Sequence, residues 1–287
     1  MARKNIFEIL NGSELDLEYE VRKLFSLLQE ECIDYLGSYT VEAFVDEYEF
    51  AKWPHRCRCR DTDEMKLRLN IRNLKQILSS NFNTLNYLEY IGNMLFLCQN
   101  TDEFLDYDDD FNYITESLRY ILDQLNMSFY THPSNDRVTL QEKDPAATAA
   151  AEISEPQLAL SIIEYNHHTL KGDLEAKKSI LFSLGHDLER YSRELKTFRP
   201  DLADEAGFLL NSLNIRHNNS TPPEGKSLDN YIPHVAEMKP ETLEEWYDET
   251  YQVLLLCILE YDHLARKGKI KELKDACYAS KALAKKQ

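Results

Sequence analysis

The strongest candidate for chemistry in this chain is the run Arg216-His217-Asn218-Asn219, which directly follows a helical pattern ending at Leu213. An arginine presents fixed donors that suit a phosphate, and a histidine gives or takes a proton near neutral pH. Together they are sufficient to cleave RNA with its own 2′-hydroxyl group as the nucleophile and without a metal. Asn218 and Asn219 are candidates for further hydrogen bonds to the substrate.

A purely structural interpretation of the same run stays open. Asparagines tolerate a left-handed backbone, and the two in this run can simply end a helix. Residues 222–225, with the sequence PPEG, have the composition of a turn. Arg216 can equally be an ion-pair partner for Asp187 or Glu164.

Further basic residues stand at helical spacing about 30 positions upstream. His186, Arg190 and Arg193 fall on one side of a predicted helix, away from its leucine seam. One interpretation is a basic face beside the site, with Arg190 and Arg193 contacting the substrate. The other is salt bridging with neighbouring acidic residues, which are Asp187, Glu189 and Glu194.

His167 and Lys177 fall on the apolar seam of the same helical stretch, and His168 lies beside it. A single histidine on such a seam is usually a hydrogen-bonded core residue. We expect Lys177 to pair with an acidic side chain of a facing helix, because a buried charge needs a partner.

The sequence predicts no metal site and no cofactor. His55, Cys57 and Cys59 could begin a zinc site, but no second Cys/His pair has compatible spacing. We therefore interpret residues 54–61 as a turn whose arginines neutralise acidic neighbours, which are Asp46, Glu47 and Glu49. The aspartates of residues 106–110 lack the ligand spacing and central glycine of a calcium loop. The chain contains no glycine-rich phosphate loop and no nucleophile elbow.

The elements that must position these residues are helices. Apolar residues recur at steps of three and four through most of the chain, and strand-like alternation does not last beyond a few residues. With only 8 Gly and 9 Pro among 287 residues, the composition favours helices with short connections. The fold class predicted is all-α.

Two helical lobes are expected. Residues 1–132 form an acidic N-terminal helical domain, residues 133–156 a polar, Pro-punctuated linker, and residues 157–287 a C-terminal helical domain. The longest periodic run, residues 160–198, is either one long helix or two helices broken near Gly172. Pro240 suits the first turn of the last large helix.

Charge limits the class of partner. The net charge is −17, which argues against broad nonspecific binding to nucleic acid or to an anionic membrane. Residues 1–132 carry 13 basic and 24 acidic residues, a net of −11, and residues 133–287 carry 20 and 26, a net of −6. The second half therefore repels a polyanion less strongly than the first half does.

The compartment predicted is the cytoplasm. The first residues, MARKNIFEIL, do not resemble a secretory signal, because no apolar core follows the basic residues. The longest strongly apolar run, residues 253–259, is too short to span a bilayer. The six cysteines are expected to be reduced thiols.

Residues 157–265 resemble the HEPN superfamily, in which a polar arginine motif ends a short helix after a long one. Arg216 matches the family's arginine and His217 falls at its polar position. The family's histidine, four to six positions after the arginine, is absent, and the next histidine is His234. The resemblance implies a helical bundle with His217 or His234 in place of the missing group, or an inactive relative.

HEPN domains often act as metal-independent ribonucleases in toxin–antitoxin, abortive-infection and CRISPR systems. The resemblance therefore implies an RNA substrate, a role in phage defence, a protein partner or antitoxin, and a homodimer whose site spans a two-fold interface. The alternative is a non-enzymatic helical interaction or regulatory protein. It would use the apolar stripes of its helices and its acidic face to bind a basic protein partner.

Overall fold

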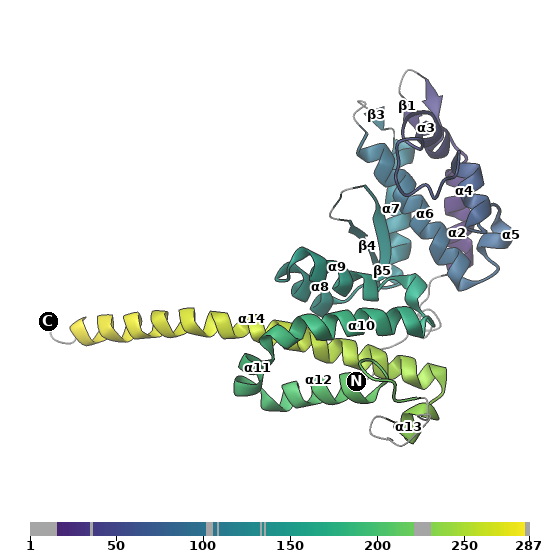
Figure 1. The fold of residues 1–287 in the computed structure, drawn as a ribbon. Helices are drawn as coiled ribbons and strands as arrows, with labels where there is room; N and C mark the ends of the chain where they lie inside the picture. The colour runs from purple at the N-terminus through teal and green to yellow at the C-terminus, as the bar shows by residue number, and fades with distance from the viewer. Residues whose placement is uncertain are drawn as a thin grey trace. The chain divides into compact units, whose positions relative to one another are not determined.

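A computed structural model describes residues 16–34, 37–101, 106–107, 109–132, 134, 136–220 and 231–284. Most of these residues are helical, and the strands are short (Figure 1). The all-α fold class predicted from periodicity is confirmed. Among the described residues, no helix is both long enough and apolar enough to cross a membrane.

The chain divides into two compact units. The first comprises Met1–Lys143 together with His167–Thr169, and the second comprises Asp144–Asn166 and Leu170–Gln287. The three residues His167–Thr169, which include the adjacent histidines, therefore belong to the first unit, although the residues before and after them belong to the second.

Residues 133–156, which were expected as a linker, instead hold regular structure. Strand β5 (Val138–Glu142) pairs antiparallel with β4 (Met127–Thr131), and helix α8 (Pro145–Glu152) follows directly. Asp144 caps α8 by accepting hydrogen bonds from two backbone N–H groups, and Pro145 suits the first turn. The alternation that signals β5 is only a few residues long, and the Ala-rich helix has no apolar stripe of large side chains, which is why both elements were missed.

The first unit is built around one long helix, α6 (Asn81–Gln99). The other helices are α2 (Leu17–Leu27), α3 (Val41–Tyr48), α4 (Thr62–Arg68), α5 (Leu74–Ile77) and α7 (Asp109–Gln124). A small sheet has the order β2-β1-β3, from β1 (Ile33–Asp34), β2 (Ser38–Tyr39) and β3 (Asp106–Tyr107). The core is formed by apolar side chains from all of these helices, with Leu88 and Ile91 of α6 fully buried.

Helix α6 binds the β4–β5 hairpin through polar side chains. Asn93 donates to the carbonyl of Val138 at 2.9 Å and accepts from its N–H at 3.0 Å. One turn earlier, Glu89 accepts from the N–H of Leu140 at 2.8 Å. Because these backbone groups are buried and need partners, Asn93 and Glu89 fix the position of β5 on the helix.

Gly92 lies between these two residues and faces the ring of Phe129 in β4. A methyl group at this position would overlap the ring. Gly92→Ala is therefore expected to lower the free energy of unfolding of the first unit by about 1–3 kcal/mol. Gly207→Ala is the matched control, because nothing lies near that helical glycine, and it is expected to stabilise by up to about 1 kcal/mol. Urea unfolding measures both, and equal effects would show that Phe129 moves aside freely.

The second unit is a helical bundle. Its further helices are α9 (Pro156–Tyr165), α10 (Leu174–Leu188), α11 (Ser192–Phe198), α12 (Pro200–Ser212), α13 (Pro233–Ala236) and α14 (Pro240–Ala284), with the 3-10 turn η2 (Glu189–Tyr191). The 3-10 turn η1 (His168–Leu170) is shared, because His168 and Thr169 belong to the first unit and Leu170 to the second. Of the two alternatives for residues 160–198, a break near Gly172 is confirmed, because that residue has a left-handed φ of 79°. A second break follows at η2.

Helix α14 is the longest element and is continuous to Ala284 (Figure 1). Its first half contributes Tyr247, Tyr251 and Leu254 to the buried core of the unit, against α10, α12 and α8. Every residue from 265 to 281 is exposed. The helix therefore continues well past the bundle that its first half stabilises.

Candidate functional site

The segment after α12 that was predicted as a catalytic run is a closed turn. The side-chain oxygen of Asn219 accepts from the N–H of Asn214 at 3.0 Å, and that of Asn214 accepts from the N–H of Asn219 at 3.1 Å. Asn214 has a φ of 59°, and Asn219 is buried. The side chain of Asn219 thus closes the turn, but the left-handed residue after the helix is Asn214, whereas the structural interpretation expected Asn218 or Asn219. The expected PPEG turn at 222–225 lies outside the described residues.

Arg216 lies within this turn and contacts the end of α10. Its Nη2 donates to the carbonyl of Gly185 at 3.0 Å and lies 3.0 Å from a carboxylate oxygen of Glu189. The side chain keeps 22% of its surface exposed. The ion-pair partner is therefore Glu189, rather than Asp187 or Glu164 as the structural alternative suggested.

The other predicted site residues lie at the surface. His217 and Asn218 are exposed in the turn, and His234 is exposed on α13. Arg190 pairs with Asp187 at 2.9 Å, which confirms salt bridging for that side chain. Arg193 is exposed on α11.

Few of these residues are brought together by direct contacts. The carboxylate of Glu189 joins Arg216 to the end of α10 and also lies 3.7 Å from Nδ1 of His186. Among the contacts between described residues, none joins His234 to Arg216. Among the described residues, the titratable side chain held against Arg216 is therefore the carboxylate of Glu189 rather than a second histidine.

The basic segment of residues 54–61 forms a turn, but its arginines do not neutralise the expected carboxylates. Arg60 pairs with Glu64 at 3.2 Å. Asp46 instead accepts two hydrogen bonds from Thr62, and Lys52 pairs with Glu49. The helix start at Thr62 needs an anion near its N-terminus, which accounts for the position of Asp46.

A polar network lies in the second unit around Lys177. Its Nζ lies 2.8 Å from Glu244 and 2.7 Å from Asp248, both on α14. Tyr165 donates to Asp248 at 2.9 Å, and the N–H of Gly172 donates to Glu244 at 2.8 Å. The prediction that Lys177 pairs with a facing helix is confirmed, and the network is fully hydrogen-bonded structure rather than a site.

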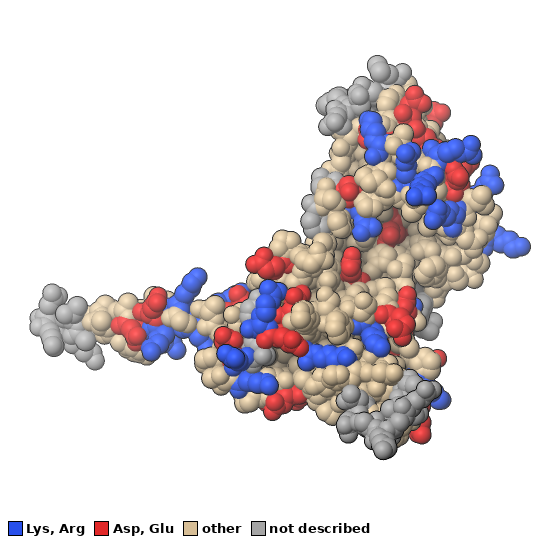
Figure 2. All heavy atoms as spheres, in the orientation of Figure 1, with Lys and Arg blue, Asp and Glu red and all other residues tan. Residues whose placement is uncertain are grey.

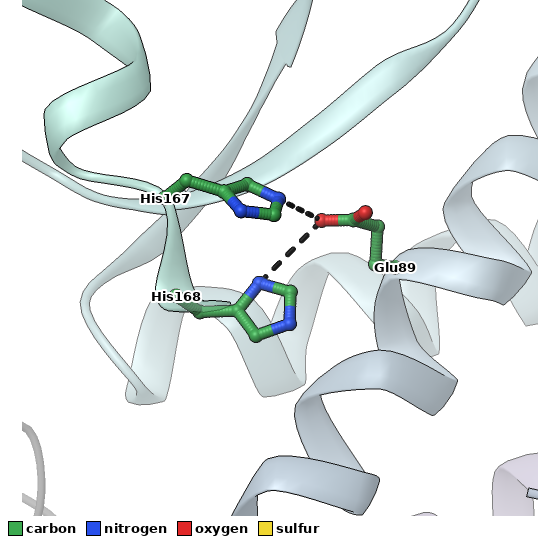
Figure 3. Close-up of side chains that lie close together, drawn as sticks. All are labelled: Glu89, His167 and His168. Carbon is green, nitrogen blue, oxygen red and sulfur yellow. Dashed lines mark hydrogen bonds and ion pairs between the residues drawn. The ribbon is translucent and has the colours of Figure 1, made fainter. Parts of the chain in front are cut away.

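The first unit contains a cluster that the sequence did not reveal. Glu89 of α6 faces His167 and His168, whose rings approach the same carboxylate oxygen (Figure 3). The oxygen lies 2.8 Å from Nε2 of His167 and 3.4 Å from Nδ1 of His168. The three ligand atoms lie within 4.8 Å of one another. We call these three residues the Glu89 cluster.

The far nitrogen of each ring also has a partner. Nδ1 of His167 lies 2.6 Å from the hydroxyl of Thr169, and Nε2 of His168 lies 3.0 Å from Oδ1 of Asn86. Nδ1 of His168 also lies 3.2 Å from the carbonyl oxygen of Leu140. Both rings are therefore held in fixed orientations.

The electrostatics of the cluster favour an ionised carboxylate beside a neutral ring. Burial raises the pKa of Glu89, but the hydrogen bond from His167, the charges of both histidines and the N–H of Leu140 outweigh it, and the pKa is lowered. Burial lowers the pKa of the His168 imidazole. Both groups thus hold fewer protons in the folded chain than in the unfolded chain.

The expectation that a seam histidine is a hydrogen-bonded core residue is confirmed for this pair. The acidic member was missed because Glu89 lies 78 residues before His167 and shows no local spacing signal. Only the return of His167–Thr169 to the first unit brings the residues together.

A cavity of about 460 Å³ also lies in the first unit, among α6, α7 and the β4–β5 hairpin. Its lining is largely apolar, with Leu95, Leu118 and Met127. The charged residues at its rim include Lys143 and Asp123, which pair with each other at 2.6 Å. This arrangement offers room for a small, largely apolar group.

Comparisons with known proteins identify no relative. No protein-family model, no curated protein and no solved structure matches this chain.

Proposed function

We propose that this chain is a helical interaction protein that binds a protein partner through the exposed part of α14. The single observation that carries the proposal is the exposure of residues 265–281, in a helix whose first half is packed into the core. We call residues 265–281 the arm. Isolated helices of this length are marginal in water, because most helical stability in proteins comes from packing of an apolar face.

Apolar side chains recur along one side of the arm and form a stripe that could lie in a binding groove. Ile270, Leu273 and Cys277 recur at steps of three and four, and Leu273 is 66% exposed. Small residues flank the stripe, at Gly268 and Ala276, and permit close approach of another backbone. This is the pattern of an amphipathic helix that lies in a groove.

The charge of the arm defines the partner further. Its basic residues are Arg266, Lys267, Lys269, Lys271, Lys274 and Lys281. Its acidic residues are Glu272 and Asp275, which leaves a net of +4 on the arm of a chain whose net charge is −17. Figure 2 shows basic and acidic side chains standing out along this part of the helix.

A protein partner explains these features better than nucleic acid or a membrane. A polyanion would be repelled by the rest of the chain and would not need the apolar stripe. A lipid surface favours a helix with Trp, Phe and Leu on its apolar face, whereas the arm has no Trp or Phe and contains Ala265, Ala276 and Ala279. The partner class is therefore a protein with an apolar groove rimmed by carboxylates, rather than the basic partner expected from the acidic face.

The arm can be tested by replacing Leu273 with Asp, beside Phe208→Asp as the control. Phe208 of α12 is also 66% exposed, but it lies outside the arm. A photo-crosslinking residue at position 273 is expected to capture one protein, and that purified protein is expected to bind the wild type and Phe208→Asp equally. Leu273→Asp is expected to weaken binding at least about tenfold, because one desolvated charge opposes the groove.

The same experiment distinguishes a protein partner from other molecules that could bind the arm. Binding is expected to weaken with salt, since the arm and the groove carry opposite charge. Capture of a second copy of this chain, with dimerisation lost in Leu273→Asp, would make the partner the homodimer expected from the HEPN resemblance. Capture of RNA or of lipid vesicles, or equal binding by both variants, would contradict the proposal.

A second candidate function is metal-independent cleavage of RNA by the turn that contains Arg216, in a cytoplasmic phage-defence or toxin system. The reciprocal hydrogen bonds of Asn214 and Asn219 hold this turn rigidly, which favours a preformed site. Both contacts of the Arg216 guanidinium use Nη2, and a guanidinium has five N–H donors. Arg216 would bind the scissile phosphate, and His217 or His234 would transfer protons.

A further inference from the structure

We propose that the Glu89 cluster binds a divalent transition-metal ion of the zinc class. Two imidazoles and one carboxylate are a ligand set that suits zinc and its neighbours, whereas calcium and magnesium prefer oxygen ligands only. The sequence predicts no metal site, and Glu89 lies 78 residues before His167, so no local spacing connects these ligands.

The two distances from the Glu89 oxygen to the ring nitrogens lie near those of a tetrahedral site, and the two ring nitrogens lie within 4.8 Å of each other. Bonds of about 2.0–2.1 Å separate the ligand atoms of tetrahedral zinc by about 3.3–3.4 Å. The 3.4 Å between Glu89 and Nδ1 of His168 matches this separation. The 2.8 Å between Glu89 and Nε2 of His167 must open by about half an ångström, which a partly exposed side chain can accommodate.

The outer hydrogen bonds orient the two rings for a metal. If His168 donates its Nε2–H to Asn86 and His167 its Nδ1–H to Thr169, the remaining lone pairs are those that converge on Glu89. Metal-binding histidines usually donate their second N–H to such an acceptor, which fixes the tautomer. In that tautomer, Nδ1 of His168 faces two acceptors, Leu140 O and Glu89, and a bound cation would take the place that a proton on Nδ1 fills otherwise.

The cluster is also accessible from solution. The side chain of His168 is 2% exposed, but those of His167 and Glu89 are 21% and 23% exposed. An ion could therefore approach the cluster through the partly exposed side chains of His167 and Glu89, and a water would complete its coordination. Binding would tie α6 to the segment His167–Thr169 within the first unit.

Cobalt(II) and zinc(II) titrations of the purified chain test the site. Wild type is expected to bind one ion per chain, with the cobalt absorption of a nitrogen–oxygen site and no thiolate charge-transfer band. Zinc is expected to raise the thermal midpoint, because it binds only the folded state. His167→Gln removes one ligand, whereas His263→Gln is the matched control, because His263 is exposed on α14.

Asn86→Ala provides a readout that distinguishes a positioning role from a purely structural one. This variant keeps all three ligands, and it is expected to weaken metal binding by about ten- to a hundredfold. His167→Gln is expected to weaken binding further, and His263→Gln to leave it unchanged. Circular dichroism checks that each variant is folded, and Glu89→Gln serves as a second ligand variant because it retains an acceptor for the N–H of Leu140.

Three results would overturn the metal site. The first is no binding by the wild type, which would leave the cluster as a hydrogen-bonded triad that holds only a proton. The second is unchanged binding in both His167→Gln and Glu89→Gln. The third is a thiolate charge-transfer band, which would place the ion at cysteines, of which Cys57 and Cys277 are exposed.

Discussion

Lys177→Met is expected to lower the free energy of unfolding of the second unit by about 3 kcal/mol, which is the lower end of the range for breaking a buried ion pair. The Lys177 side chain is 8% exposed and lies within 2.8 Å of both Glu244 and Asp248. Without it, two carboxylates remain next to each other with no cation between them. The loss is reduced because the side chain of Asp248 is 41% exposed and water can screen its charge.

Chemical unfolding monitored by circular dichroism measures this effect. Lys196→Met is the control, because Lys196 is exposed on α11, and a surface substitution of this kind usually changes stability by no more than about 0.5 kcal/mol. A Lys177→Met variant as stable as Lys196→Met would show that the network contributes no net stability.

The pH dependence of the unfolding free energy, compared between wild type and Lys177→Met, gives an independent check. Burial raises the pKa of Glu244, but the hydrogen bond from Gly172 and the ammonium of Lys177 outweigh it, and the pKa is lowered. A carboxyl with a depressed folded-state pKa stabilises the fold above its unfolded pKa of about 4.3 and loses that contribution as the pH falls further. Wild type should therefore lose stability below about pH 4.3 more steeply than Lys177→Met, in which the pKa of Glu244 rises.

Local patterns were sufficient for the helices and for the partner of Lys177. Steps of three and four residues place one side of a helix in the core, and a lysine on such a seam must find a carboxylate within reach. The sequence pointed to Gly172 as the place of a possible break, but it did not show whether the helix is interrupted there. An apolar stripe can continue across a short turn, so its periodicity is the same in both cases. An apolar stripe also does not show how far a helix extends beyond the core, so it did not predict that α14 continues to Ala284 with residues 265–281 exposed.

The features that were missed depend on contacts between distant parts of the chain. Strand β5 is too short to show a clear alternation, and its edge is satisfied by Asn93 and Glu89 of α6. The Glu89 cluster exists only because the three residues of His167–Thr169 return to the first unit. No spacing rule connects these positions, so the sequence could supply two histidines but not the carboxylate between them.

The predicted run at Arg216 illustrates a different difficulty. Arg, His and Asn are the residues of a phosphate-cleaving site, and they are also residues that end helices and close turns. The structure uses Asn219 for the turn and pairs Arg216 with Glu189. Residue type and spacing do not distinguish these uses, since both place the same side chains after the same helix.

Arg216→Ala separates the two uses by activity. For the ribonuclease candidate, we expect the wild-type chain to cleave a pool of RNAs in the presence of EDTA, and Arg216→Ala to lose cleavage by about a hundredfold or more. Losses of this size follow removal of a group that stabilises developing charge in the transition state. His217→Ala and His234→Ala then show which histidine transfers protons, because only the functional one should reduce cleavage comparably.

Glu189→Ala is the variant that distinguishes a catalytic arginine from a structural one. Glu189 holds the guanidinium at 3.0 Å but has no place in the chemistry, and its side chain is 54% exposed. If Arg216 binds the phosphate, removal of Glu189 frees it, and cleavage is retained or raised while Arg216→Ala stays inactive. If Arg216 is structural, Glu189→Ala should destabilise the second unit by about 1 kcal/mol or less, as for an exposed pair, and Arg216→Ala by more, because it also loses the hydrogen bond to the Gly185 carbonyl. Equal and negligible cleavage by wild type and Arg216→Ala would exclude the ribonuclease, because a group that stabilises the transition state cannot be removed without a change in rate.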